Sequence, residues 1–474
     1  MSRSSMKLAL AIVSVTLMAV AAAGCGSDDG GTSSEGGLEA IRVPQDAATI
    51  QQAVDSAEEG DLVLVDAGVY REAVDVTTPN LTIRGVDRNE VVLDGGFELE
   101  NGIRVLDTDG VVVENMTARN YVSNGFFWTG SDYYRGSYLT AYRNGDYGLY
   151  AFDAYHGQFD HSYASGSPDA GFYIGECFEC DAVIDSVVSE YNGLGYSGTN
   201  SGGELYIVNS EFAFNRAGIV PNSGAYELCY PNRETTLAGN VVHDNNYLEG
   251  PGIEVSLLAQ GNGILVAGAV RNTITKNLVY DHDRTGIGLV PYPEEDANDL
   301  APDLSEWDTP CAETHDEPVP EIAEDQCQAV EGLLEPCVVI WHPYENSVVG
   351  NEVTGSGVAD LAVATIDLVG EGVTTEALRN CFSDNIFTSS APSDLEVLAP
   401  CDGTGSGDWS LDALDLVGIF LDTPPTPSAD AYKSTPEPPA QENMPGARTE
   451  PAERFTGPVL PDVAAISVPA RPAS

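Results

Sequence analysis

Glycines followed by an apolar or aromatic residue recur at an almost constant interval, and this period constrains the fold more than any other feature of the chain. The steps between them are 23, 23, 23, 24 and 23 residues, for Gly102, Gly125, Gly148, Gly171, Gly195 and Gly218. The step from Gly263 to Gly286 is 23 again. A fixed period of this length is typical of a solenoid whose coils consist of short strands and turns.

The residue after each glycine should face the interior, because alternate residues of a strand point to opposite sides. We expect these side chains to stack about 4.8 Å apart from coil to coil: Ile103, Phe126, Leu149, Phe172, Tyr196 and Ile219. A second pattern, N-x-hydrophobic-x-x-N, spans Asn272–Asn277, Asn346–Asn351 and Asn380–Asn385. Asparagines at fixed turn positions tolerate left-handed backbone and can form hydrogen-bonded ladders between coils.

Two segments carry a resemblance to a known family. The segment GILVAGAVRNTITKNLVYDHDRTGIGL, residues 263–289, closely resembles the repeat unit of right-handed parallel β-helix proteins, which include the pectate lyase-like enzymes and the periplasmic NosD-type repeat proteins. The stretch TIQQAV…GDLVLVDAGVYRE, from Thr49 to Glu72, is similar to the N-terminal cap and first coil of pectin-active β-helix proteins. The resemblance implies an all-β chain, a single-stranded right-handed parallel β-helix of roughly a dozen 23-residue coils, with a short N-terminal capping helix.

The sequence also predicts the limits of the solenoid. We expect the β-helix over residues 39–422, with loops leaving the coils at 222–234 and 249–262. Residues 291–337 form a longer insertion that is rich in Asp, Glu and Pro and contains three cysteines, and the coils should resume at Val338–Trp341. Residues 423–474 are proline-rich, which predicts a tail that is extended or disordered, and that could lie along the solenoid.

The first residues predict export. Residues 1–24 combine a basic start, Arg3 and Lys7, with an apolar run that is short for a bilayer span of about 20 residues. The ending Ala22-Ala23-Gly24-Cys25 resembles the lipobox of bacterial lipoproteins, which implies cleavage before Cys25, diacylation of that cysteine and anchoring at the membrane or cell surface. The alternative is an ordinary signal peptide. We expect residues 25–38 to form a flexible tether between the signal sequence and the solenoid.

The cysteine count agrees with export. Eight cysteines remain without Cys25, and an even number outside the cytoplasm favours disulfides. The pair Cys177-x-x-Cys180 could instead bind zinc or act in redox chemistry. Zinc would require a second pair at similar spacing, which the sequence lacks, so structural bridging is the favoured interpretation.

The charge of the chain excludes some partners. There are 74 acidic and 20 basic residues, a formal net charge of -54. A surface this negative repels phosphate, which argues against binding to nucleic acid or to anionic lipid. We expect a monomer that contacts the membrane only through its lipid anchor.

An aromatic stripe is the first candidate site. The second residue after the glycine should point outward, and in three successive coils it is Phe127, Tyr150 and Tyr173. These rings would cover about 10 Å of one face, and flat aromatic surfaces suit the apolar faces of sugars. The stripe predicts binding of a polysaccharide, or of another component of the cell envelope. Alternatively, the rings pack under a loop or under the C-terminal tail.

Carboxylates beside the stripe suggest a cation. Asp153, Glu176 and Glu179 fall in related positions of adjacent coils. Stacked carboxylates repel unless they are separated, protonated or bridged, and calcium is the natural bridge for clustered oxygens. The same residues could also form a solvated acidic face without any ion.

A looser motif suggests catalysis. The segment Tyr150-Ala-Phe-Asp153-Ala-Tyr-His156 resembles the Y-x-F-D-P-H motif of β-helix alginate epimerases and lyases, with one additional residue before the histidine. The resemblance implies Tyr150 and His156 as acid and base, with Asp153 beside them. Arg143 or a calcium ion could stabilise the enolate-like charge. The alternative is that His156 is a surface turn residue.

Three functions follow as expectations. The first is a cell-surface protein that binds, and by lyase-like or epimerase-like chemistry processes, a polysaccharide. The second is a non-catalytic envelope scaffold or adhesion protein. The third is a NosD-like copper maturation factor, which five methionines and six dispersed histidines disfavour.

Overall fold

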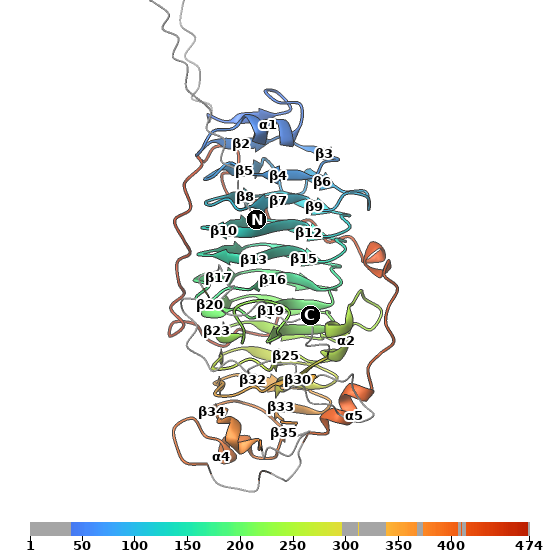
Figure 1. Ribbon diagram of the computed structural model, residues 1–474, viewed down its shortest axis with the longest axis vertical. Helices are drawn as coiled ribbons and strands as arrows, with labels where there is room; N and C mark the ends of the chain where they lie inside the picture. The colour runs from blue at the N-terminus through green and yellow to red at the C-terminus, as the bar shows by residue number, and fades with distance from the viewer. Residues whose placement is uncertain are drawn as a thin grey trace, which may run out of the picture. The chain divides into compact units, whose positions relative to one another are not determined.

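Three long parallel sheets wind around one interior. The computed structural model describes residues 39–295, 311, 338–366, 373–405, 409 and 414–472. In sequence order the strands pass from an A sheet to a B sheet to a C sheet and back, and each strand pairs with its counterpart one coil away (Figure 1). The chain is a right-handed parallel β-helix, which confirms the predicted fold class.

The A sheet contains β1 (Ile41–Val43), β2 (Leu62–Val65), β5 (Thr82–Gly85), β8 (Val112–Glu114), β11 (Arg135–Ser137), β14 (Gln158–Asp160), β17 (Ala182–Asp185), β20 (Gly202–Val208), β23 (Arg233–Ala238), β26 (Thr273–Thr275), β31 (Ser347–Val349) and β34 (Cys381–Ser383). The B sheet contains β3 (Gly68–Tyr70), β6 (Val91–Asp94), β9 (Thr117–Arg119), β12 (Thr140–Tyr142), β15 (Tyr163–Ser165), β18 (Val188–Glu190), β21 (Glu211–Ala213), β24 (Val241–His243), β27 (Leu278–Tyr280) and β32 (Glu352–Thr354). The C sheet contains β4 (Val74–Val76), β7 (Ile103–Leu106), β10 (Phe126–Asp132), β13 (Leu149–Tyr155), β16 (Ala170–Gly175), β19 (Leu194–Thr199), β22 (Ala217–Asn222), β25 (Ile264–Ala267), β28 (Thr285–Val290), β33 (Ala359–Val363) and β35 (Ser390–Ala391).

The interior is built from the residues that follow the periodic glycines. They occupy equivalent positions of successive C-sheet strands and are at most 1% exposed: Ile103, Phe126, Leu149, Phe172, Tyr196 and Ile219. The predicted inward stack is therefore confirmed. Burial of each large side chain adds about 1.5–3 kcal/mol to the stability of the fold, relative to an exposed side chain. The stack repeats this gain in each successive coil.

Asparagine ladders join the coils at the corners. The Nδ2 of Asn240 donates to Asn277 Oδ1 at 3.0 Å, Asn277 Nδ2 to Asn351 Oδ1 at 2.9 Å, and Asn351 Nδ2 to Asn385 Oδ1 at 2.9 Å. A parallel ladder runs from Asn272 to Asn346 and Asn380. These are the positions of the N-x-hydrophobic-x-x-N pattern, so the predicted ladders are also confirmed.

A helix covers the first end of the solenoid. Helix α1 (Ile50–Ser56) begins after Thr49, whose side chain accepts a hydrogen bond from the backbone N–H of Gln52 at 3.1 Å. Its apolar side is buried against the first coils, which covers strand edges that would otherwise be open. The predicted capping helix is confirmed. At the other end lie α4 (Leu395–Leu398) and η2 (Glu376–Leu378).

Insertions leave the coils where the sequence indicates. One connects β22 to β23, and another contains α2 (Glu254–Leu258). Strands β29 (Tyr292–Glu295) and β30 (Val338–Trp341) pair antiparallel at the base of the long insertion. The coils therefore resume at β31 rather than at Val338. The last coil strand is β35, and helix α5 (Leu416–Leu421) lies beyond it, before the expected end near Asp422.

The C-terminal tail lies extended along the solenoid, apart from η3 (Ala431–Ser434). Its orange-to-red trace follows both flanks of the coils in Figure 1. Basic side chains of the coils donate to its carbonyls: Arg143 to Thr435, Arg84 to Glu450 and Lys276 to Val463, at 2.6–2.8 Å. Among the described residues, no hydrogen bond or ring contact joins the tail to a C-sheet strand.

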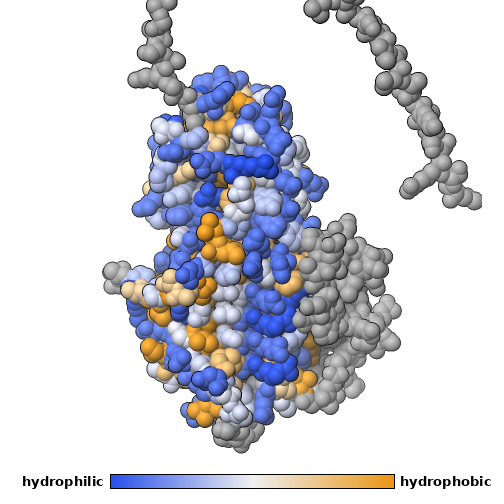
Figure 2. Space-filling view, turned by 90° about the vertical axis from the view of Figure 1, so that its left-hand side faces the viewer, coloured by the Kyte–Doolittle hydropathy of each residue, from blue (hydrophilic) through white to orange (hydrophobic). Residues whose placement is uncertain are grey.

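Hydrophilic residues cover most of the long face shown in Figure 2, and hydrophobic residues are confined there to a broken strip. The predicted signal sequence, the predicted tether and Cys25 lie outside the described residues, as do Cys327 and Cys337. Within the described ranges, no helix has both the length and the hydropathy to span a bilayer.

Candidate functional site

The structure brings the three predicted rings together on the outer face of the C sheet. Phe127, Tyr150 and Tyr173 occupy one register position on β10, β13 and β16. Both steps between ring centroids are 4.8 Å. Tyr147 joins the group and stacks on Tyr150 at 4.3 Å, with the planes 13° apart. We call Phe127, Tyr147, Tyr150 and Tyr173 the aromatic platform.

The platform is open at one end and covered at the other. Phe127 and Tyr150 are half-buried, whereas Tyr173 is only 1% exposed. The loop between β22 and β23 covers Tyr173, whose hydroxyl donates to the two carboxylate oxygens of Glu227 at 2.7 and 2.6 Å. Tyr173 therefore packs under a loop, which was the alternative to an open stripe. The accessible part of the platform lies around Phe127 and Tyr150.

Carboxyl groups line the platform. The hydroxyl of Tyr147 donates to Asp169 Oδ2 at 2.6 Å. Burial raises the pKa of Asp169 to about 7, and the charge of Asp146 adds to this rise. Burial also raises the pKa of Asp146 to about 6. The pKa of Glu227 lies well above its ordinary value, because this carboxyl is buried and close to Glu176 and Asp169.

These acids make the platform a source of protons. The raised pKa brings protonation of Asp169 toward neutral pH, and a protonated carboxyl near a bound substrate is a general acid. Burial and the neighbouring carboxylates also raise the pKa of Tyr150, so its hydroxyl stays protonated. In the free protein, Tyr150 is therefore suited to donate a hydrogen bond rather than to exchange a proton.

Sequence reasoning missed Asp146, Asp169 and Glu227. A signal existed for the first two, since Asp146 lies two residues before Gly148 and Asp169 lies two before Gly171. They therefore share one phase of the repeat and stack on adjacent coils. No comparable signal marks Glu227, because it belongs to a loop outside the repeat.

The residues of the looser catalytic motif lie on β13 and at the corner that follows it. Tyr150 is near the start of β13, His156 follows its last residue, and Asp153 between them has a left-handed φ of 48°, so the chain bends within this strand. His156 Nδ1 is 2.8 Å from Asp181 Oδ2, and its ring stacks on Tyr133 at 4.9 Å. The described contacts of His156 are thus with Asp181 and Tyr133, and an acid–base pair of Tyr150 and His156 stays a prediction.

Arg143 is also directed away from Tyr150. It follows β12, adopts a left-handed φ of 55°, and donates from Nε to the carbonyl of Thr435 in the tail at 2.7 Å. Its guanidinium also lies 5.7 Å from the ring of Tyr142. The described contacts of Arg143 are therefore with the tail and with Tyr142.

The predicted calcium ligands are only partly brought together. Asp153 lies within β13 and Glu176 directly follows β16, and both have left-handed φ angles, 48° and 52°. Glu176 accepts a hydrogen bond from the backbone N–H of Leu228 at 2.8 Å, whereas Glu179 is exposed in the next loop. In the part of the chain that the structure describes, no group of three or more His, Cys, Asp or Glu side chains is arranged to hold a metal. Calcium binding stays a prediction.

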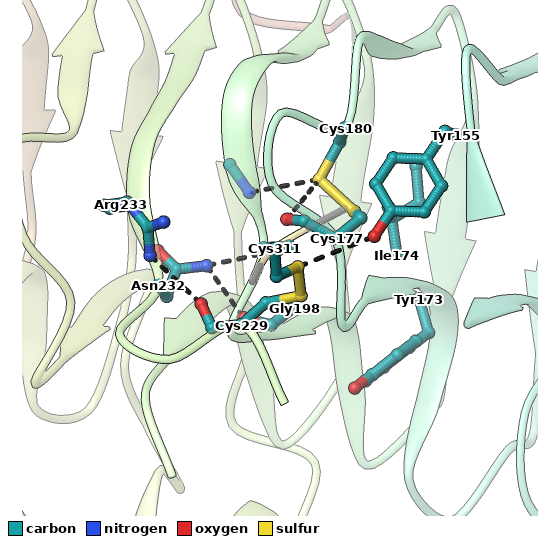
Figure 3. The surroundings of a disulfide bond; sticks show 12 residues. Tyr155, Tyr173, Ile174, Cys177, Cys180, Gly198, Cys229, Asn232, Arg233 and Cys311 are labelled. Atoms are coloured by element: carbon teal, nitrogen blue, oxygen red, sulfur yellow. Dashed lines mark hydrogen bonds between the residues drawn. A yellow bond between two sulfur atoms is a disulfide. The ribbon is translucent and has the colours of Figure 1, made fainter. Parts of the chain in front are cut away.

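Disulfides hold the loop that covers Tyr173. Cys177 pairs with Cys180, and Cys229 pairs with Cys311 of the long insertion, as Figure 3 shows. The guanidinium of Arg233 lies 3.5 Å from the centre of the Phe178 ring and donates to the carbonyl of Cys229 at 3.0 Å. A third disulfide joins Cys381 to Cys401. The Cys177-x-x-Cys180 pair is therefore a disulfide in this structure.

Comparisons with known proteins give distant similarities to solved structures. No family model and no curated protein matches the chain. The A-module of the mannuronan C-5 epimerase AlgE4 of Azotobacter vinelandii is 15% identical, covering 74% of this chain and 93% of its own, with a TM-score of 0.46. For the AlgE6 A-module from the same organism the identity is 16%, the coverage 73% and 95%, and the TM-score 0.43. An alginate lyase from Paenibacillus is 14% identical, covers 50% of this chain and 87% of its own, and has a TM-score of 0.35. Likenesses this distant carry no argument about activity.

Proposed function

We propose that the protein binds a polysaccharide on the outer face of the C sheet, with Phe127 and Tyr150 as the surface on which sugar rings stack. The observation that carries the proposal is the in-register stack of rings on successive coils, 4.8 Å apart. Such a surface is rigid, because parallel strands fix each ring, and a rigid platform loses little entropy on binding. A half-buried aromatic surface beside polar groups is typical of a ligand site.

The acids beside the platform support a chemical step as well as binding. Asp169 and Asp146 can supply or accept protons near neutral pH, because burial raises the pKa of both. A lyase-like or epimerase-like step additionally needs a base and a cation at the substrate carboxylate. Arg143 does not supply that cation, since it is bound to the tail. Proton donation to a bound sugar is therefore the chemistry that the described residues support best.

The proposed setting is outside the cytoplasm. Three disulfides among the described residues fit an oxidising compartment, and the N-terminal sequence fits export with a lipid anchor at Cys25. We propose that the anchored protein presents its solenoid at the cell surface as a monomer.

Binding tests the platform directly. Calorimetric titration with a panel of soluble polysaccharides should give binding that falls about tenfold or more in Phe127→Ala and in Tyr150→Ala, which corresponds to about 1.4 kcal/mol. Tyr206→Ala is the matched control, because Tyr206 is a half-buried outward ring on the A sheet. Affinities that the platform variants leave unchanged would refute the proposed site.

Activity is tested separately on the polymers that bind. Incubation in D2O allows three signals to be measured in one experiment: new reducing ends, ultraviolet absorbance of unsaturated sugar ends, and deuterium at the carbon that loses a proton. Unsaturated ends or deuterium would indicate lyase-like or epimerase-like chemistry, and reducing ends alone would indicate hydrolysis. If binding persists with no reaction, the protein is a scaffold or adhesion protein instead.

A further inference from the structure

The outward row of the C sheet that contains the platform rings is accessible over only part of its length. Four residues at one register position on β4, β7, β10 and β13 are exposed or half-buried: Asp75, Arg104, Phe127 and Tyr150. The row continues into three residues on β16, β19 and β22 that are at most 4% exposed: Tyr173, Ser197 and Val220. The accessible part of the row therefore ends abruptly after Tyr150.

The loop between β22 and β23 forms this boundary, and we call its residues 223–232 the end loop. Its Glu227 accepts the hydrogen bonds of the Tyr173 hydroxyl at 2.7 and 2.6 Å, so the loop lies over the ring that follows Tyr150 in the row. A ligand that lay on Phe127 and Tyr150 and continued along the solenoid axis would meet the end loop within one coil, about 4.8 Å further on.

The end loop is fixed at several points. The disulfide between Cys229 and Cys311 holds it covalently. Hydrogen bonds of 2.8–2.9 Å join it to the coils and to β29: Asn200 to the carbonyl of Glu227, the N–H of Leu228 to Glu176, and the N–H of Ala225 to Glu294. These attachments fall within five consecutive residues, so the loop is a fixed boundary of the platform rather than a lid.

The row is accessible in the opposite direction. From Tyr150 it passes Phe127 and Arg104 and reaches Asp75 on β4, the first strand of the C sheet, about 14 Å away over three strand spacings. Arg104 pairs with Asp75 at 2.9 Å, and both side chains remain partly exposed. A ligand that lies on the platform can therefore extend toward the first coils, but it cannot extend past Tyr173.

We infer, on the basis of the proposed function, that the platform binds the end of a polysaccharide chain and not its interior. The terminal sugar lies on Tyr150 against the end loop, and the next sugars lie on Phe127 and toward Arg104. An internal segment has sugars on both sides, and those on one side would occupy the space of the end loop. This steric clash excludes internal segments, whereas the rings themselves would accept either.

Chain length provides the first test. One polysaccharide that binds is cut into fractions of increasing length, and each fraction is titrated calorimetrically with the full chain, its concentration being counted as moles of polysaccharide chains. We expect one bound protein per polysaccharide chain at every length, with a Kd per chain that is constant within about twofold once the row is filled. Binding to internal segments would instead make the number of bound proteins grow with length, and that result would overturn the inference.

A shortened end loop provides the second test. In this variant a Gly-Gly pair replaces residues 225–229, and Cys311→Ser removes the thiol that would lose its partner. The number of proteins bound to each long polysaccharide chain should rise at least about threefold, because the row would continue onto Tyr173 and admit internal segments. The affinity for the shortest fraction that binds should stay within about threefold.

The matched control changes another loop. Leu248→Gly combined with Glu249→Gly alters exposed residues between β24 and β25, and one protein per chain is expected to remain. Circular dichroism checks the fold of both variants, and the length series of the unaltered protein decides the question if the shortened loop does not fold. A folded variant that still binds one protein per long chain would overturn the inference but leave the proposed function standing. If no fraction of any polysaccharide binds the unaltered protein, the proposed function itself fails, and the inference with it.

Discussion

Asp169 is a carboxyl whose burial in the solenoid raises its pKa to about 7. It lies beside Tyr147, which donates to it, and beside Asp146 on the preceding coil. Water cannot solvate its charge fully, so burial favours the protonated form. The place of Asp169 in the repeat thus determines its burial, and its burial brings its titration near neutral pH.

The raised pKa predicts how stability depends on pH. The folded chain retains a proton on Asp169 up to about pH 7, whereas the unfolded chain releases it near pH 4. The folded state therefore binds more protons in this window, and the free energy of unfolding should decrease as pH rises from about 4 to about 7. In Asp169→Asn this decrease should be smaller by on the order of 2 kcal/mol.

Urea unfolding of both proteins at several pH values measures this difference. The comparison between the two isolates Asp169 from other groups that titrate in the same range, such as His161 and His243, whose pKa values are raised by carboxylate partners. Identical pH profiles for the two proteins would show that Asp169 titrates normally.

Tyr173 provides a second test at the residue scale. Its hydroxyl donates to Glu227 in a buried contact, so Tyr173→Phe should lower the free energy of unfolding by about 1–3 kcal/mol. Tyr150→Phe, on the same face of the preceding strand, should cost much less because its hydroxyl is closer to the open end. Chemical denaturation of both variants checks the difference, and equal effects would contradict the assigned contact.

At the scale of the strand, alternation separates packing from binding. Leu149 points into the interior and is fully buried, while the next residue, Tyr150, points outward. Leu149→Ala should lower the free energy of unfolding by about 2–5 kcal/mol, whereas Tyr150→Ala should affect stability less and polysaccharide binding more. Thermal unfolding and titration of the same two variants give both values. If Tyr150→Ala lost much stability and Leu149→Ala did not, the result would contradict the assignment of Leu149 to the interior and Tyr150 to the outer face.

Regular elements were predictable because the repeat specifies them many times over. Glycine phase located the inward stack and the outward rings, since both are set by the two-residue period of a strand. The N-x-hydrophobic-x-x-N pattern located the asparagine ladders. Two local features were not predictable. The segment Val338–Trp341 has the composition of a coil strand but pairs antiparallel with β29. Asp153 has a left-handed φ inside β13, so the chain bends between Tyr150 and His156, and the glycine period does not show this bend.

In the candidate site, too, the residues that belong to the repeat were predictable, and the residue from an insertion was not. The rings and the stacked acids Asp146 and Asp169 belong to the repeat, and their common phase is visible in the sequence. Glu227 reaches Tyr173 only because a loop folds back over the C sheet and is bonded to the insertion through Cys229. Contacts between a repeat and its insertions depend on how each inserted loop folds back onto the coils. A periodic sequence pattern contains no information about such contacts.

At the scale of the whole molecule, the tail and the platform use different faces. The tail accepts hydrogen bonds from Arg84, Arg143 and Lys276, on or beside the A and B sheets. A chain ending at Asp422 should therefore be less stable by about 3 kcal/mol, since several buried or half-buried cations lose their acceptors. Its affinity for a polysaccharide should stay within about twofold of the full chain.

Thermal unfolding and titration of the shortened chain test both expectations together. Loss of binding at preserved stability would mean that the tail contributes to the site. Unchanged stability would mean that its hydrogen bonds are replaced by water at no cost.

The contact between Arg84 and Glu450 joins residues that are 366 positions apart in the chain. Arg84 belongs to one of the earliest coils, and its guanidinium is almost completely enclosed once the tail is in place. A nascent chain that emerges from the ribosome or from an export channel has made this arginine long before it makes the acceptor. The first coils therefore cannot complete their hydrogen bonding until translation is nearly finished.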